Sequence, residues 1–202
     1  STGRYAFGPL ALSMGLASLR RLDPLQVAIS GLADLVTETG QSAAIAVWGN
    51  HGATVVHLQE STRPLHVNLR VGSVMSVLNT ATGQVFAAYL PDEVIQDQLR
   101  REGMDGSPTL GAGADHGPTL EAARRAVHSH GLARTVSYPI PGVSAFSAPV
   151  LDHRGALQLA ITLLGAAPGF DSDWQGPLAS ALRVYALDVT RRLGGRDGSL
   201  GR

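Results

Sequence analysis

The sequence predicts an α+β domain in which helices pack on one mostly antiparallel sheet. Apolar runs come in pairs separated by short turns, at 42–48 and 54–60 and again at 145–151 and 156–164. Such pairs are typical of β-hairpins, whereas a parallel sheet requires strand–helix–strand repeats. Elsewhere apolar residues recur three or four positions apart, which predicts amphipathic helices that cover the sheet.

The composition limits what this domain can do. The chain has 202 residues, 44% of them hydrophobic, with 16 basic and 16 acidic side chains and no cysteine. This is typical of one substantial folded domain or two small ones, and the balanced charge argues against a nucleic-acid-binding surface. The lack of cysteine excludes disulfides and thiolate chemistry. No apolar run reaches the roughly 20 residues that span a bilayer, so we expect a cytoplasmic protein without membrane contact.

Two helical segments precede the first hairpin. Residues 5–22 have a loose helical pattern that Gly15 interrupts. Asp23 followed by Pro24 is typical of a helix start, and apolar residues recur at helical spacing from there to position 36. They predict one amphipathic helix that ends at Gly40, because glycine is the preferred residue type just after a helix.

The middle of the chain predicts strands followed by helices. Residues 49–52 form the turn of the first hairpin. Alternating apolar and polar residues over 65–71 predict a half-exposed strand. A loop then leads to a helix that begins near Thr82 and ends before Pro91, and a short helix follows over 92–102.

The later elements are predicted in the same way. Residues 103–117 contain five glycines and one proline, which indicates a surface loop. Thr119 caps a helix, and a short strand is expected at 135–138 before the second hairpin. The last helix is expected to begin at Asp171 or Asp173.

No group of residues predicts catalysis. Ser147 lies near His153 in the sequence, but strand geometry separates a hairpin turn from the strand it follows. A metal site built from His57, Glu60 and His66 is an alternative to the favoured interpretation, in which these are exposed polar strand positions. We therefore expect no catalytic residue, no metal and no cofactor.

A ligand site is the stronger prediction. Small side chains are interleaved with large ones on both strands of the second hairpin, which leaves room for a packed helix or a ligand. Residues 76–85 are small and polar and precede a helix. The N–H groups at such a helix start can bind a carboxylate without a basic side chain, although an ordinary loop–helix junction is the alternative.

Several short sequence motifs follow one another along the chain, and their order and spacing resemble those of a known family. They are YAFG at 5–8, STRPL at 61–65, VGS at 71–73, TATG at 80–83, HGL at 130–132 and SAPVLD at 147–152. From Tyr5 to about Leu193 the chain resembles the effector-binding domain of an IclR-type bacterial transcriptional regulator. The resemblance implies a GAF-like, mostly antiparallel sheet of about six strands flanked by helices, with an effector cavity on one face.

The resemblance also implies a division of the chain and a set of partners. Residues 1–22 would be a helical lead-in from an N-terminal winged helix-turn-helix, 23–195 the GAF-like effector-binding domain, and 196–202 a flexible tail. The implied partners are a small-molecule effector and further copies in a homodimer or homotetramer. DNA would be bound only through the winged helix-turn-helix domain, expected before Ser1.

Residue by residue, the resemblance implies where the effector lies. The expected contacts are Leu78, Ala81, Thr82, Val136, Ala145, Ser147 and Thr162. Members of the family often have His where Leu78 stands, Lys at Gln84 and Cys or Ser at Ala145, so this pocket has lost charge and hydrogen-bonding groups. Since an unmatched buried polar group costs roughly 1–3 kcal/mol, we expect an aromatic or fairly apolar organic acid rather than a very small oxo-acid. The alternatives are a GAF-like enzyme and a purely structural dimerisation domain.

Overall fold

The computed structural model describes residues 23–63, 65, 67–104, 109–113 and 117–196. In this part of the chain, six strands form one antiparallel sheet in the order β3-β2-β1-β6-β5-β4. The strands are β1 (Ser42–Gly49), β2 (Gly52–Gln59), β3 (Val74–Met75), β4 (Ala133–Thr135), β5 (Val143–Leu151) and β6 (Leu157–Ala166). The predicted fold class and both hairpins are confirmed. The expected helix at 5–22 and most of the expected tail lie outside the described residues.

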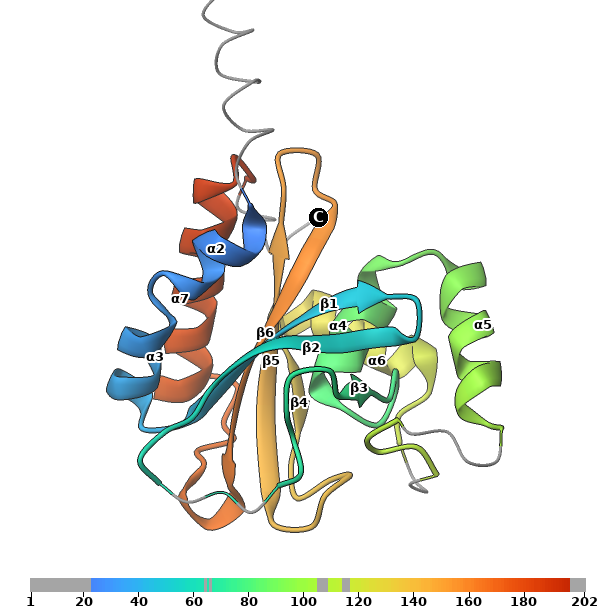
Figure 1. The fold of residues 1–202 in the computed structure, drawn as a ribbon, viewed down its shortest axis with the longest axis horizontal. Coiled ribbons are helices and arrows are strands. Elements are labelled where there is room, and N and C mark those ends of the chain that lie inside the picture. The colour runs from blue at the N-terminus through green and yellow to red at the C-terminus, as the bar shows by residue number, and fades with distance from the viewer. Residues whose placement is uncertain (1–22, 64, 66, 105–108, 114–116, 197–202) are drawn as a thin grey trace, which may run out of the picture.

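Helices cover both faces of this sheet (Figure 1). On one face lie α2 (Pro24–Ile29), α3 (Leu32–Thr39) and α7 (Pro177–Arg192). On the other lie α4 (Ala81–Tyr89) and α6 (Leu120–His130), with α5 (Asp92–Glu102) packed outside α4 through Ile95 and Ala87. Among the described helices, none has the length and apolar character needed to cross a membrane.

The two faces of the sheet are filled differently, because successive side chains of a strand point to opposite sides. The α7 face carries large side chains, namely Ile45, Phe146, Val150, Leu159, Ile161 and Leu163. The α4 face carries mainly small ones from β1, β4, β5 and β6, namely Ala44, Ala46, Ala133, Ala145, Ser147, Ala160 and Thr162, beside the larger Leu157 and Leu164. Large side chains therefore fill the core between the sheet and α7, whereas the side chains between the sheet and α4 leave more space.

The helix expected to run without interruption from residue 25 to 36 is broken into α2 and α3. The break falls at Ser30 and Gly31. A Cβ atom at Gly31 would lie 3.2 Å from the ring of Tyr185 on α7, whose hydroxyl donates to the carbonyl oxygen of Ala28. Close packing against this ring explains the glycine. The apolar spacing continues across the break, so the sequence pattern did not reveal it.

The strand expected at 65–71 is not formed by the described residues of that segment. At this edge of the sheet, the N–H of Val55 donates to Ser73 O (2.9 Å) and the N–H of Gly72 donates to Val55 O (2.8 Å). The backbone of β2 is therefore bonded to the chain just before β3, and 65–71 runs outside the sheet. Its alternating apolar side chains still pack against the core under α4, which is the burial that the alternation reflected.

Two element boundaries also differ from prediction. The strand expected at 135–138 is β4, which ends before the positive φ of Ser137 (48°). The last helix begins at Pro177 rather than at Asp171 or Asp173. Each of these carboxylates accepts the backbone N–H two residues ahead, at 2.9 Å. They stabilise turns before the helix instead of capping it.

Candidate functional site

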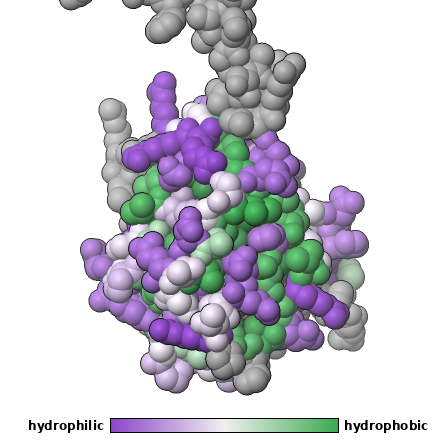
Figure 2. Space-filling view, turned by 60° about the vertical axis from the view of Figure 1, so that its left-hand side comes forward, coloured by the Kyte–Doolittle hydropathy of each residue, from purple (hydrophilic) through white to green (hydrophobic). Residues whose placement is uncertain are grey.

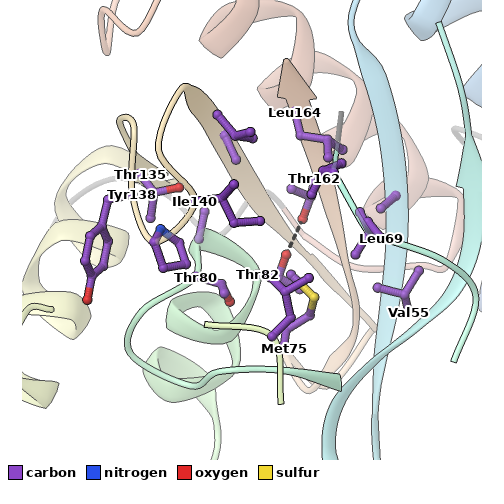
Figure 3. Close-up of a pocket in the computed structure, with 17 residues that line it drawn as sticks. Val55, Leu69, Met75, Thr80, Thr82, Thr135, Tyr138, Ile140, Thr162 and Leu164 are labelled. Carbon is purple, nitrogen blue, oxygen red and sulfur yellow. Dashed lines mark hydrogen bonds between the residues drawn. The ribbon is translucent and has the colours of Figure 1, made fainter. Parts of the chain in front are cut away.

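A cavity lies between the small-residue face of the sheet and the first turn of α4 (Figure 3). The space between its walls is about 500 Å³, including the part open to solvent, and about 50 Å³ of it can hold the centre of a water molecule. The sheet contributes Ala44, Val55, Met75, Thr135, Val143, Ala145, Thr162 and Leu164. The other walls are Val67, Leu69, Thr80, Ala81, Thr82, Leu110, Tyr138, Pro139 and Ile140. Among the residues that the structure describes, this lining contains no charged side chain.

The 50 Å³ that water centres can occupy is small. For comparison, an engineered cavity that takes up benzene measures about 150 Å³. An aromatic ring therefore requires the walls to separate. One wall is suited to this: Val67 and Leu69 belong to the segment that runs outside the sheet. Moving it breaks no ladder of strand hydrogen bonds.

The first turn of α4 presents two unpaired backbone donors. The Thr80 hydroxyl caps the helix by accepting the N–H of Gly83 (3.0 Å) and donates to Ser76 O (2.7 Å). Among the described residues, the N–H groups of Ala81 and Thr82 have no hydrogen-bond partner. Both residues line the cavity and are only 1% and 3% exposed. Unpaired donors at a helix N-terminus favour an anion.

A row of hydroxyl groups fastens this turn to the sheet. The Thr82 and Thr162 hydroxyl oxygens are 2.8 Å apart, and the Thr162 hydroxyl donates to Ser147 Oγ at 2.9 Å. A hydroxyl has one proton to donate, so Thr82 is the donor to Thr162. The contacts join α4, β6 and β5. They leave Thr82 and Thr162 satisfied within the protein.

Thr135 has the opposite character. It is 7% exposed and lines the cavity from β4, and among the described residues its hydroxyl has no hydrogen-bond partner. No fully buried side-chain nitrogen or oxygen in this part of the chain lacks a partner. The Thr135 oxygen therefore keeps some accessible surface, and the cavity is the space that it lines.

The loop that precedes α4 is held from its outer side by Glu102 of α5. The carboxylate accepts from Ser76 Oγ (2.8 Å) and from the N–H of Val77 (3.0 Å). Burial raises the pKa of Glu102, and the hydrogen bonds from Ser76, Val77 and Gln98 oppose that shift. At the other end of the cavity, Tyr138 OH donates to Asn79 Oδ1 (2.8 Å).

The seven residues expected at the effector site fall into two groups. Ala81, Thr82, Ala145 and Thr162 line the cavity together. The other three do not. Ser147 is fully buried behind Thr162, Leu78 packs toward the cluster of Val77 and Ile95, and Val136 is 48% exposed.

Sequence reasoning missed Thr135 and Tyr138, and it included Thr80 only as part of the 76–85 loop. For Thr135 a signal existed: Ala133 and Thr135 share a strand face, and Val136 falls on the opposite one. The structure also shows where the candidate nucleophile and the candidate metal ligands lie. Ser147, a candidate nucleophile, is covered by protein, and the described residues contain no group of three His, Asp or Glu side chains that could hold a metal. His66 lies outside them.

Comparisons of the sequence and of the structure with known proteins indicate the same family. The family model described as the C-terminal domain of the bacterial transcriptional regulator IclR matches residues 16–191. The HTH-type transcriptional regulator TtgV of Pseudomonas putida is 27% identical over 192 residues, 95% of this chain and 71% of that protein. The crystal structure of Pseudomonas aeruginosa HmgR has a TM-score of 0.82 and 35% identity, covering 98% of this chain and 78% of that one. Thermotoga maritima IclR shares the fold, with a TM-score of 0.70, 18% identity and coverage of 93% and 75%.

Proposed function

The chain belongs to the IclR family of bacterial transcriptional regulators, as their effector-binding domain, and we propose that the cavity beside α4 is its effector site. Regulators of this family bind small-molecule effectors, and they bind DNA through their N-terminal domain. We further propose that the effector is an aromatic or fairly apolar organic acid. The observation that carries this proposal is that the N–H groups of the buried residues Ala81 and Thr82 have no partner among the described residues, in a mostly apolar cavity.

The acid group is argued from these donors. A carboxylate that enters the cavity finds no lysine, arginine or histidine among the described residues that line it. The N–H groups of Ala81 and Thr82 supply the donors instead, and the α4 dipole adds favourable potential. Hydrogen bonds to a charged group contribute about 1.5–3 kcal/mol, enough to orient a small ligand.

The apolar body is argued from the remaining walls. Val55, Leu69, Met75 and Ile140 surround the space beyond the helix start. Each 100 Å² of apolar ligand surface buried here contributes about 2.5 kcal/mol. A very small oxo-acid has little apolar surface to bury, so it gains little of this binding free energy and leaves the apolar walls in contact with water.

We propose in addition that the domain forms a homodimer or homotetramer through the outer side of α7. Val184 is 70% exposed and Leu187 is 36% exposed on this helix. A surface groove lined by Leu35, Ala181 and Tyr185 adjoins them. Figure 2 shows apolar surface among polar side chains on this side of the molecule. Light scattering coupled to size-exclusion chromatography tests the proposal, and a monomer at micromolar concentration contradicts it.

Isothermal titration of the purified chain tests the effector class. Benzoate and phenylacetate are expected to bind measurably, and glyoxylate and pyruvate at least tenfold more weakly. Tight binding of glyoxylate or pyruvate with no heat from the aromatic acids contradicts the proposed class. Absence of binding by every acid contradicts the carboxylate site itself.

A further inference from the structure

We propose that a second hollow, at the end of α3, binds a small oxyanion, a carboxylate or a phosphate group, through Arg63 and Gln41. This Arg63 hollow lies where β1 begins and β6 ends, and the space between its walls is about 290 Å³, including the part open to solvent. Its described lining is Gln41, Ser42, Ser61, Arg63, Leu65, Leu164, Gly165, Ala166 and Gly169. Of these residues, Leu164 alone also lines the cavity beside α4, so the proposal stands apart from the effector site.

Gln41 contributes a buried amide without a partner. It is 4% exposed, and its side chain forms no hydrogen bond with any residue that the structure describes. Gly165 of β6 makes room for this side chain, because a Cβ atom there would collide with Gln41 Oε1. With Oε1 turned toward β6, Nε2 is the end of the amide that is left to meet a ligand. A buried amide without a partner costs free energy, which a bound acceptor offsets.

Arg63 brings a positive charge to the same place. A Cβ atom at Gly40 would lie 3.2 Å from Arg63 Cζ, so the guanidinium rests against the backbone at the end of α3. Within the described part of the chain, the guanidinium forms no hydrogen bond or ion pair, and no carboxylate lines the hollow. The α3 dipole favours a cation here, but it leaves the N–H donors of Arg63 unused.

The backbone around Arg63 is anchored to β1. The N–H of Arg63 donates to Ser61 Oγ (3.3 Å), and the N–H of Ser61 donates to Ser42 Oγ (3.0 Å). Ser42 is the first residue of β1, directly after Gln41. The two side chains of the proposed site are therefore held beside each other by short connections.

The strand register adds a backbone donor. Ala166 lies opposite Val143, and the next N–H along β6, that of Ala167, donates to Gly142 O at 2.8 Å. This is the pattern of a non-hydrogen-bonded pair, so the N–H of Ala166 points away from β5. On that side the pairing of β6 with β1 ends at Ser42. No described residue accepts a hydrogen bond from Ala166.

The chemistry of these groups selects an oxyanion. The guanidinium of Arg63, Nε2 of Gln41 and the N–H of Ala166 are all donors. A carboxylate or a phosphate accepts several hydrogen bonds at once, and a guanidinium presents a planar fork that matches two of its oxygens. A cation would find no carboxylate among the described lining residues. The hollow is small, which restricts the ligand to a few heavy atoms.

The test is an NMR titration of the purified chain with sodium acetate and, separately, with sodium phosphate, at an ionic strength held constant with sodium chloride. The backbone amide signal of Ala166 is followed in the parent and in three variants. Arg63→Gln removes the charge, and Gln41→Leu removes the amide at similar size. Arg154→Gln is the matched control, because Arg154 lies in the exposed turn between β5 and β6. Thermal unfolding verifies that each variant is folded.

The expected result is a saturable shift of the Ala166 signal with at least one of the two anions, and the anion that saturates it identifies the chemical group. Arg63→Gln is expected to weaken this binding at least tenfold and Gln41→Leu about three- to tenfold, with Arg154→Gln equal to the parent. If neither anion gives a saturable shift, the proposal is overturned. A saturable shift that Arg63→Gln leaves unchanged reports another site and overturns it as well.

Discussion

The hydroxyl of Thr82, in the first turn of α4, lies 2.8 Å from the hydroxyl of Thr162 on β6. This contact fixes the start of the helix against the small-residue face of the sheet. Thr162 also donates to Ser147 on β5, so one side chain holds three elements together. The cavity exists where this row of hydroxyls keeps α4 beside a surface of small residues.

The first prediction concerns Thr162. Replacement by valine leaves the hydroxyls of Thr82 and Ser147 without their partner in a buried place, so the free energy of unfolding falls by about 1–3 kcal/mol. Urea denaturation measures it. The control is Thr37→Ala, because the Thr37 hydroxyl bonds to Ala33 O at an exposed position of α3. Equal stability of the two variants would show that the buried row contributes nothing.

A second prediction concerns pH and Glu102. Burial raises the pKa of this carboxyl above its ordinary value of 4.5, so the folded state favours the protonated form. The stability from this group is complete below the ordinary pKa and is lost as pH rises through the folded pKa. Glu102→Gln is expected to reduce that loss in urea titrations between about pH 4 and 8. A variant whose stability falls with pH as steeply as the parent contradicts this assignment.

A third prediction tests the close approach of α4 to the loop before it. A methyl group at Gly83 would collide with the carbonyl oxygen of Ser76 and with the backbone of Val77. Gly83→Ala is therefore expected to cost about 3 kcal/mol, because backbone must shift. Gly169→Ala meets no atom within 4 Å and is the matched control, expected within about 0.5 kcal/mol. Similar melting temperatures for the two would contradict the packing described for α4.

A fourth prediction concerns assembly. Val184→Glu places a charge on the apolar outer side of α7, near the carboxylates of Asp34 and Asp188 that line the same groove. The variant is expected to shift toward a smaller species in light scattering. Val94→Glu, on an exposed position of α5 (38%), serves as the control and keeps the parent mass. An unchanged mass for Val184→Glu places the interface elsewhere.

The fold was predictable where local chemistry and burial agree. The 49–52 turn, the Thr119 cap and the glycine after α6 each demand one backbone conformation, and these elements lie as predicted. The segment 65–71 shows the limit. Its alternating apolar residues reflect burial of one side of the segment. Whether the segment pairs as a strand depends on which part of the backbone forms hydrogen bonds with Val55 of β2, and residues 72–73 do so instead. No local sequence pattern determines this choice.

The resemblance implied seven contact residues, and Ala81, Thr82, Ala145 and Thr162 are the ones that line the cavity. Ala81 and Thr82 stand at a recognisable helix start, and Ala145 and Thr162 share one face of a clear hairpin. Val136 was expected on the cavity side, but β4 is short and its register is set by pairing with β5, which brings Thr135 there instead. The unpaired state of the Thr135 hydroxyl is a property of the packed structure and leaves no trace in the sequence.

The most direct test of the account is the titration of benzoate against Ala81→Pro. Proline is well tolerated at the first position of a helix, and Thr80 already has the extended backbone that favours a following proline. The substitution removes one N–H from the proposed carboxylate site, and Ala81→Ser keeps it as the control. The account predicts at least tenfold weaker binding by Ala81→Pro, with Ala81→Ser close to the parent, and thermal unfolding verifies that each variant is folded. Equal binding of benzoate by the folded Ala81→Pro variant and the parent would contradict it.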